Sequence, residues 1–355
     1  MITGGLGFVG SHLAEALDKD GHEIIILTRS YKKKSNLKIS KRMKIDKVNV
    51  TNFRKLNDSI DKNKPDLIIH LAGENRPRDL SEFETVNSEL TRSLCEVIRA
   101  NGRQIPLILA SSTQANLDNP YGKSKLAAEV AVERLANETG NPVHIYRLPG
   151  VFGKWCRPNF NSVVATFCNN IANGIPIQIK DESTKLNLVY VDDVVADFIR
   201  MIQQESEGVA RRVVEPQYNI TLGEVADQIR AFKNCRVNLI SEQVGTGFVR
   251  VLYSTYVSYL KPEQFSYSIP RYGDERGIFV EMLKTKESGQ ISYFTAHPGV
   301  TRGGHYHNSK TEKFLVIKGS AHFVFRHIVT DELYEIFTNG DESIVVDTVP
   351  GWTHD

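Results

Sequence analysis

Hydrophobic and polar positions alternate in two different ways along the chain. In residues 1 to about 150, short apolar β-rich runs such as EIIIL (23–27) and PLILASS (106–112) are separated by stretches with apolar residues at helical spacing, such as SHLAEALDKDG (11–21). Strands that alternate with amphipathic helices are typical of a parallel sheet covered on both faces. The pattern therefore predicts a doubly wound α/β domain.

The pattern changes near residue 268. From there on, strand-like runs follow one another with only turns between them: GIFVEML (277–283), QISYFTA (290–296), EKFLVIKG (312–319) and SAHFVFRHI (320–328). This favours a small all-β domain. We expect an α/β domain over residues 1–243, a linker or docking arm over 244–267, and the β domain over 268–355.

Composition narrows the class of protein. A hydrophobic fraction of 41% and a charged fraction of 24% are ordinary for a globular protein, and 355 residues suit two domains. The net charge of +2 argues against a nucleic-acid partner, and no apolar run is long enough to span a membrane. Without a signal peptide we expect a cytoplasmic protein. The four scattered cysteines suit reduced thiols, and the chain's ends lead us to expect clipped termini and an incomplete β domain.

Three glycines open the chain at the spacing G-x-x-G-x-x-G. Gly4, Gly7 and Gly10 lie between a short apolar run and an amphipathic helical stretch. Such a loop lets backbone N–H groups approach a pyrophosphate at the positive end of a helix. The alternative is a purely structural turn between strand and helix. We favour a dinucleotide site, because a helical stretch and a second strand-like run follow the glycines.

The residues after the second predicted strand favour NADPH over NADH. An acidic side chain there binds the ribose hydroxyls of NAD, but this chain has Arg29, followed by Lys32, Lys33 and Lys34. An arginine pairs well with a 2′-phosphate. The alternative is that these cations form a solvated loop.

The stretch NPYGKSK (119–125) places Tyr121 and Lys125 four residues apart at the start of a predicted helix, so both lie on one face. A cation beside a phenol lowers its pKa and makes it a proton donor or acceptor near neutrality. The stretch ASSTQ (110–114) ends a predicted strand and supplies a hydroxyl that can bind a substrate carbonyl.

These motifs resemble the extended short-chain dehydrogenase/reductase superfamily, whose fold is of Rossmann type. TGGLGFVG, HLAG, YGKSK, RLPGVFG and VYVDDV match its motifs in order over about residues 1–240. The resemblance implies that Thr113, with Ser112 as the alternative, acts with Tyr121 and Lys125. The cofactor-binding residues that it implies are Gly4, Gly7, Phe8, Val9, Gly10, Arg29, Leu71, Ala72, Tyr121 and Lys125.

Two departures from the superfamily bear on the reaction and the substrate. Sugar-nucleotide dehydratases carry Thr-Asp-Glu where this chain has Thr113-Gln114-Ala115, so we expect carbonyl reduction rather than dehydration. The extended branch favours nucleotide-diphosphate sugars. Arg157, Asn159 and Asn161 are candidates to grip such a substrate, although the ordinary polarity of a loop explains them equally well.

A second constellation lies near the end of the chain. In GGHYHNSKTEKFLVIKG (303–319), His305 and His307 share one face of an extended segment, and Glu312 and His354 follow. Three imidazoles and a carboxylate suit Zn²⁺ or another divalent transition metal. The alternative is a set of structural histidines. The first motif resembles the cupin superfamily, which has a jelly-roll fold, and YGDERGIFVEML (272–283) resembles the first strand of deoxysugar 3,5-epimerases.

The combination of the two halves resembles the CapF-type bifunctional enzymes of capsule and O-antigen synthesis. The resemblance implies NADPH-dependent reduction at C4 of a UDP-2-acetamido-2,6-dideoxy-4-hexulose, coupled to C3 epimerisation in the cupin domain, on the route to UDP-N-acetyl-L-fucosamine. Tyr306 and Lys313 are candidates for the epimerisation base. We expect a homodimer. The alternatives are a UDP-sugar 4-epimerase or reductase with a structural cupin, and a nucleotide-sensing binding protein.

Overall fold

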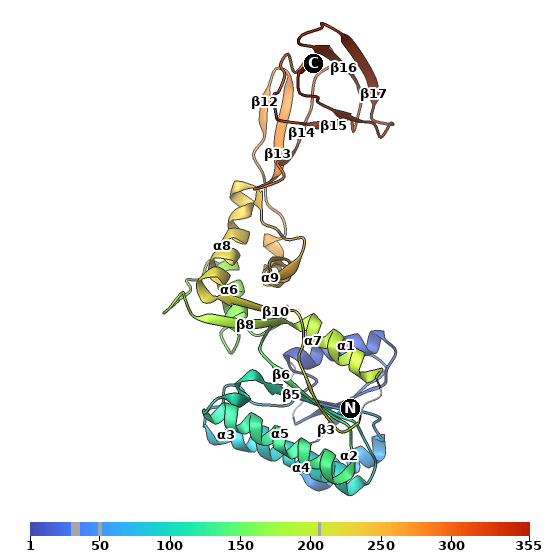
Figure 1. The fold of residues 1–355 in the computed structure, drawn as a ribbon, viewed down its shortest axis with the longest axis vertical. Helices are drawn as coiled ribbons and strands as arrows, with labels where there is room; N and C mark the ends of the chain where they lie inside the picture. Colours follow the sequence, from blue (N-terminus) through green and yellow to red (C-terminus); the bar gives the residue numbers. More distant parts are fainter. Residues whose placement is uncertain (30–35, 49–51, 205–206) are drawn as a thin grey trace. The chain divides into compact units, whose positions relative to one another are not determined.

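The computed structural model describes residues 1–29, 36–48, 52–204 and 207–355. The chain divides into two compact units, Met1–Tyr267 and Ser268–Asp355. Figure 1 shows the helices and strands of both. In the part of the chain that the structure describes, no helix is long and apolar enough to cross a membrane.

The first unit is built on a seven-stranded sheet of order β3-β2-β1-β4-β5-β6-β9, and all its neighbouring strands are parallel. The strands are β1 (Ile2–Thr3), β2 (Ile24–Thr28), β3 (Met43–Lys47), β4 (Ile68–His70), β5 (Leu107–Ser112), β6 (Val143–Leu148) and β9 (Val209–Arg212). The prediction of a Rossmann-type, doubly wound sheet is confirmed.

Successive strand residues point to opposite sides of this sheet, and those on both sides are apolar. Helices therefore cover both faces. Ile26 and Ile69 pack into one core, whereas their neighbours Leu27 and Ile68 pack into the other. The helices α1 (Phe8–Lys19) and α7 (Val191–Ile202) cover the first face. The helices α2 (Phe53–Asn63), α4 (Leu90–Asn101) and α5 (Pro120–Thr139) cover the second, as Figure 1 shows.

The same unit carries a smaller subdomain around a three-stranded sheet of order β10-β8-β7. Its elements are β7 (Gly150–Phe152), β8 (Lys185–Tyr190), β10 (Gln217–Thr221), α6 (Val163–Ala172), α8 (Leu222–Asn238) and α9 (Gly247–Val257). Leu252 and Tyr256 of α9 are buried in its core. The segment 244–267, expected as a linker or docking arm, thus contains a helix that belongs to the first unit.

The second unit is all-β, as predicted, and its strand pairs are antiparallel. β13 (Gly277–Thr285) pairs with β12 (Tyr272–Asp274) and β14 (Gln290–Phe294), and β15 (Lys313–Leu315) pairs with β18 (Val345–Asp347). β16 (Ser320–His327) lies between β17 (Leu333–Asn339) and β19 (Trp352–His354). This arrangement places His354 on the last described strand, beside the loop that carries His305.

Candidate active site and metal centre

The glycine loop joins β1 to α1 in a tight turn. The N–H of Gly7 donates to the carbonyl of Gly4 at 2.9 Å, and Gly4 has a positive φ of 71°. A Cβ atom on Gly10 would lie 2.3 Å from the Gly4 carbonyl oxygen, and one on Gly4 would lie 2.7 Å from the Ala72 nitrogen. Only glycine fits at these two positions. The loop therefore holds bare backbone at the N-terminus of α1, where Phe8 and Val9 are the first helical residues.

Arg29 lies directly after β2, and its side chain is exposed. This is the strand end at which a parallel α/β sheet selects between the two dinucleotides. The lysines at positions 32–34, which the sequence placed beside Arg29, lie outside the described residues.

The buried imidazole of His70 supports the glycine loop through hydrogen bonds that involve Thr3. The main-chain N–H of Ala72 donates to Thr3 Oγ1 at 3.2 Å, and Thr3 Oγ1 lies 2.6 Å from His70 Nδ1. On the other side of the ring, His70 Nε2 lies 3.0 Å from Thr91 Oγ1. Burial, and then the charge of Lys125, lower the pKa of His70 to about 3. His70 is therefore a neutral structural link between the loop and α4.

Tyr121 and Lys125 lie on consecutive turns at the start of α5, as predicted. Asn119 caps this helix by accepting a hydrogen bond from the N–H of Gly122 at 2.7 Å, and Pro120 occupies the first turn. Lys125 Nζ donates to the carbonyl of Ala110 on β5 at 2.9 Å. Burial lowers the pKa of Lys125 to about 8, and the charge of Glu129 opposes that shift.

The interaction between Lys125 and Tyr121 differs from the expected one. Burial raises the pKa of the Tyr121 phenol above its ordinary value, and a hydrogen bond from Ser112 is what opposes the shift. Lys125 Nζ lies 6.0 Å from the centre of the phenol ring and is bonded to a strand carbonyl instead. In this state the phenol stays protonated, which suits a proton donor.

The hydroxyl beside Tyr121 belongs to Ser112. Ser112 is the buried last residue of β5, and its Oγ accepts a hydrogen bond from the N–H of Gln114 at 3.2 Å. At Thr113 the chain turns into the 3₁₀ helix η2 (Thr113–Asn116), and the Thr113 side chain is exposed. The structure therefore brings the alternative candidate, rather than Thr113, to the phenol.

Asn87 is a site residue that sequence reasoning missed. It lies on the π-helical turn η1 (Glu84–Glu89), and its amide accepts from the N–H of Glu74 at 2.8 Å and donates to Ser124 Oγ at 3.0 Å. A Cβ atom on Gly73 would lie 3.1 Å from Asn87 Oδ1 and 3.3 Å from Lys125 Nζ. Asn87 thus fixes the loop that approaches Lys125. A single asparagine in a helical pattern was the only sequence signal.

The loop that follows β7 carries the three candidate substrate residues, and the side chains of Arg157, Asn159 and Asn161 are all exposed. The guanidinium carbon of Arg157 lies 4.8 Å from the centre of the Phe160 ring. The N–H of Asn159 donates to Thr166 Oγ1 at 3.0 Å. These contacts lie within the loop and its neighbouring helix.

In the second unit, the structure brings together all four predicted metal ligands. One ligand atom each from His305, His307, Glu312 and His354 lies within 4.8 Å of the others. The N–H of His354 donates to the carbonyl of His305 at 3.0 Å, which joins the two segments. His307 Nε2 lies 3.3 Å and His354 Nε2 lies 3.7 Å from Glu312 Oε2.

The chemistry of these side chains suits a divalent transition metal. His305 Nδ1 lies 3.1 Å from the carbonyl of Gly303, which leaves its Nε2 lone pair for a ligand. Burial, followed by the charge of His305, lowers the pKa of His354. Burial pushes the pKa of Glu312 up, but hydrogen bonds and charge from Lys310 and His307 outweigh it and lower that pKa. Neutral imidazole and ionised carboxylate are the forms that bind metal.

Comparisons with known proteins agree with this architecture. Residues 1–220 match the NAD dependent epimerase/dehydratase family, and residues 272–355 match the polysaccharide biosynthesis C-terminal domain. UDP-2-acetamido-2,6-beta-L-arabino-hexul-4-ose reductase from Pseudomonas aeruginosa is 51% identical over 356 residues, which cover 100% of this chain and 90% of that protein.

Solved structures give the same picture. The capsular polysaccharide assembling protein CapF from Staphylococcus aureus matches with a TM-score of 0.81 and 38% identity, over 99% of this chain and 90% of that chain. UDP-glucose 4-epimerase from Thermus thermophilus, in complex with NAD, matches with a TM-score of 0.60 and 20% identity, over 73% of this chain and 97% of that chain, which shows a shared fold. The chain therefore belongs to the NAD dependent epimerase/dehydratase family and is a CapF-type protein within it.

Proposed function

We propose that this protein is an NADPH-dependent sugar-nucleotide 4-ketoreductase that acts in the synthesis of a surface polysaccharide. Its substrate is a UDP-linked 2-acetamido-2,6-dideoxy-4-hexulose. The observation that carries the proposal is that Tyr121 and Lys125 lie on consecutive turns of α5, with the Ser112 hydroxyl at the end of β5 close enough to influence the pKa of the phenol. The 51% identical relative is named as a reductase of such a 4-keto sugar, which supports the substrate class.

The chain's own residues account for the protein side of the reduction. NADPH, when bound, supplies a hydride. The backbone of Gly4, Gly7, Phe8, Val9 and Gly10, with Leu71 and Ala72 beside it, forms the cradle for its pyrophosphate, since no Cβ atom fits at Gly4 or Gly10.

The proton comes from the phenol. Because burial raises its pKa, Tyr121 is protonated at neutral pH and can donate to the C4 oxygen as negative charge develops there. Ser112 holds the same oxygen by a hydrogen bond. The ammonium of Lys125, 6.0 Å from the centre of the ring, stabilises the negative charge left on the phenol after it gives up its proton, and it is near enough to the Gly73 loop to hold the ribose.

Cofactor preference rests on Arg29. Its exposed guanidinium follows β2 directly, where a 2′-phosphate of NADPH would lie in this fold. A carboxylate at this point would repel that phosphate.

The second unit is proposed to hold Zn²⁺ or a similar divalent ion on His305, His307, Glu312 and His354 and to invert C3 of the same substrate. A bound ion supplies a Lewis acid for the C4 oxygen, which acidifies the C3 proton. Tyr306 and Lys313 remain the candidate bases. The Tyr306 side chain is exposed, whereas Lys313 Nζ pairs with Asp347 at 2.5 Å, so the contacts favour Tyr306.

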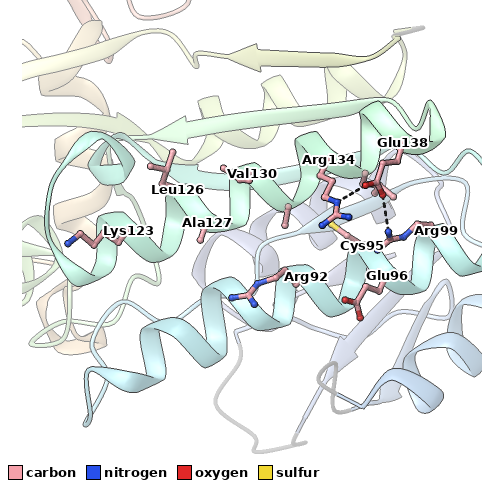
Figure 2. A pocket seen from close by; sticks show the side chains of 12 residues that line it. Arg92, Cys95, Glu96, Arg99, Lys123, Leu126, Ala127, Val130, Arg134 and Glu138 are labelled. Carbon is pink, nitrogen blue, oxygen red and sulfur yellow. Dashed lines mark hydrogen bonds and ion pairs between the residues drawn. The ribbon is translucent and has the colours of Figure 1, made fainter.

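A homodimer is part of the proposal. A groove of about 540 Å³ runs along α4 and α5. Figure 2 shows Leu126, Ala127 and Val130 on α5, with charged side chains around them. Leu126 is 44% and Val130 is 56% exposed, which is unusual for neighbouring apolar side chains on one helix face. A second copy of the chain would cover this strip.

One experiment separates the two proposed chemistries. The purified protein is incubated with the UDP-linked 4-keto sugar in D₂O, with and without NADPH, and followed by NMR. Deuterium at C3 without NADPH reports epimerisation, and a new carbinol proton at C4 with NADPH reports reduction. Reduction without C3 exchange would leave the second unit structural, and a substrate unchanged in both samples would refute the proposed function.

A further inference from the structure

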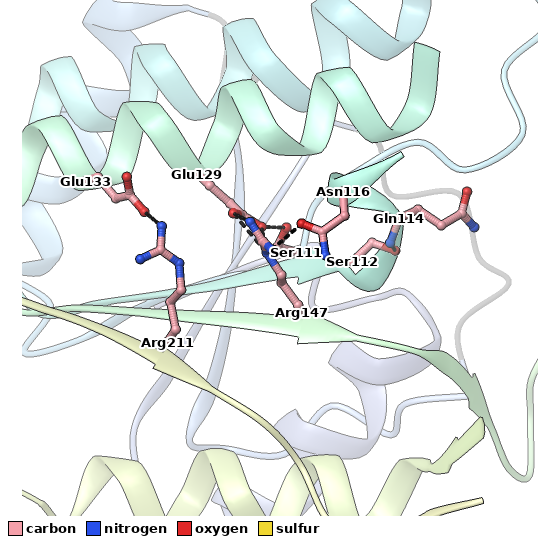
Figure 3. A network of polar contacts seen from close by, with 8 residues as sticks. All are labelled: Ser111, Ser112, Gln114, Asn116, Glu129, Glu133, Arg147 and Arg211. Carbon is pink, nitrogen blue, oxygen red and sulfur yellow. Dashed lines mark hydrogen bonds and ion pairs between the residues drawn. The ribbon is translucent and has the colours of Figure 1, made fainter. Parts of the chain in front are cut away.

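Glu129 is a buried carboxylate one turn beyond Lys125 on α5. Its exposed fraction is 1%, and the nearby Ser111 of β5 donates its hydroxyl hydrogen bond to Glu129 Oε1. Burying a carboxylate is costly unless charged and polar groups compensate it, so this position needs an explanation. Figure 3 shows the groups that surround it.

Arg147 of β6 compensates the charge of Glu129. Its Nε donates to Glu129 Oε1 at 3.0 Å and its Nη2 donates to Glu129 Oε2 at 2.7 Å, which is a two-pronged pairing. The remaining prong, Nη1, donates to Asn116 Oδ1 at 2.5 Å. One carboxylate and one guanidinium thus tie together α5, β5, β6 and the end of η2.

The tied elements are those that carry the reductase residues. Ser111 precedes Ser112, and Asn116 ends the 3₁₀ helix that starts after Ser112. Lys125 lies on the same helix face as Glu129, since four residues separate them. The network therefore holds the end of β5 and the start of α5 together through residues next to the site.

We propose that Glu129 is a positioning residue for proton transfer, which holds Ser112 against Tyr121 through Ser111 and Arg147 and places a carboxylate beside Lys125. This inference rests on the proposed function. Glu129 is not proposed to touch substrate or cofactor.

The charges around Lys125 support this role. Within the described residues, the titratable groups near it are Glu129 and the Tyr121 phenol on its own helix and His70 on β4, which is neutral. Burial lowers the pKa of Lys125 to about 8, and Glu129 is the group that raises it. Without the carboxylate, the amine would lose its proton at a lower pH.

The first test measures Lys125 directly and needs no substrate. The full chain is labelled with [ε-¹³C]lysine, the Lys125 signal is assigned with Lys125→Arg, and its pKa is followed by NMR. We expect Glu129→Gln to lower the pKa of Lys125 by about one unit, as for loss of one nearby opposite charge. Arg147→Met leaves the carboxylate unpaired and should raise that pKa. A purely structural role predicts no such opposite shifts.

Glu133→Gln is the matched control. Glu133 lies one turn further on α5 and pairs with Arg211 of β9, so this variant removes the same kind of ion pair away from Lys125. Its Lys125 titration should match that of the parent chain. If Glu129→Gln does not fold, the upward shift in Arg147→Met still tests the proposal.

The second test follows turnover. Glu129→Gln should lower kcat about tenfold at pH 7 and move the alkaline limb of the pH profile to lower pH, with the KM for NADPH within twofold. An unmoved Lys125 titration, or shifts of the same sign in both variants, would overturn the inference. A chain that shows these shifts but does not reduce the sugar would refute only the proposed function.

Discussion

The ammonium of Lys125 donates a hydrogen bond to the main-chain carbonyl of Ala110 at 2.9 Å, while it stands 6.0 Å from the centre of the Tyr121 ring. The cation is therefore anchored to the strand that ends at Ser112, and the Ser112 hydroxyl opposes the rise in the pKa of the Tyr121 phenol. The hydrogen bond from Lys125 to Ala110 thus joins the end of β5 to the start of α5 in this site.

Replacing Tyr121 by phenylalanine removes the proposed proton donor. We expect a loss of about 100-fold or more in NADPH oxidation with the 4-keto sugar, the usual size for a general acid. Packing should persist, because the ring lies 5.5 Å from that of Phe83 and keeps this contact. Stopped-flow absorbance at 340 nm measures the rate, and fluorescence titration checks that NADPH still binds. Parent-like turnover in the variant would exclude Tyr121 as the donor.

Two alanine variants decide between the neighbouring hydroxyls. Ser112→Ala removes the hydroxyl that opposes the rise in the pKa of the phenol, and we expect kcat to fall about 100-fold, as for loss of one donor to a developing oxyanion. Thr113→Ala alters an exposed side chain, and its effect should stay within about twofold. Steady-state kinetics on both variants gives the answer. The reverse ranking would return the role to Thr113.

Arg29→Asp tests cofactor choice. A charge-assisted hydrogen bond contributes about 1.5–3 kcal/mol, so the variant should lose at least about tenfold in affinity for NADPH. The carboxylate should also improve NADH binding by accepting from the ribose hydroxyls. Parallel titrations with the two cofactors measure the ratio. Arg42→Asp, which changes an arginine paired with Asp18, is the control for charge alone.

His305→Ala removes one of the four clustered ligands in the second unit. We expect the bound metal to fall well below one ion per chain by elemental analysis, and C3 deuterium exchange to slow with it. Reduction at C4 should be retained. His322→Ala is the control, because His322 stacks on Phe337 at 4.1 Å and lies outside the cluster. Full metal content in His305→Ala would argue against the site.

Val130→Glu places a charge in the apolar groove along α4 and α5. We expect the mass in solution, measured by light scattering, to drop from two chains to one. Val237→Glu changes another exposed valine of the same unit and should leave the mass unchanged. If neither variant changes the mass, the groove is not the dimer contact.

Sequence reasoning succeeded where a motif is local. Spacing within a few residues was enough to predict three features. These are the glycine loop, the position of Tyr121 and Lys125 on one helix face, and the change from alternating helices and strands to strands alone. Among the four candidate metal ligands, His305 and His307 follow from the periodicity of a strand. His354 needed a distant strand to return to His305.

The remaining features depend on where elements end and what packs behind them. The choice between Ser112 and Thr113 is set by the last residue of β5, and Asn87 enters the site through a π-helical turn. The burial of Glu129 depends on Arg147, eighteen residues away on β6. No local pattern carries that information.

The imidazole beneath the glycine loop has a consequence for behaviour in acid. The pKa of His70 is about 3 in the folded chain, against an ordinary value of 6.5. Between these two pH values, His70 is protonated in the unfolded chain and neutral in the folded chain. Folding therefore weakens as pH falls below 6.5, by up to about 1.4 kcal/mol for each pH unit, and the contribution is complete above 6.5. Acidification between pH 6.5 and 3 would therefore lower the free energy of unfolding of this unit, while His70 in the folded chain stays neutral and keeps its contacts with Thr3 and Thr91.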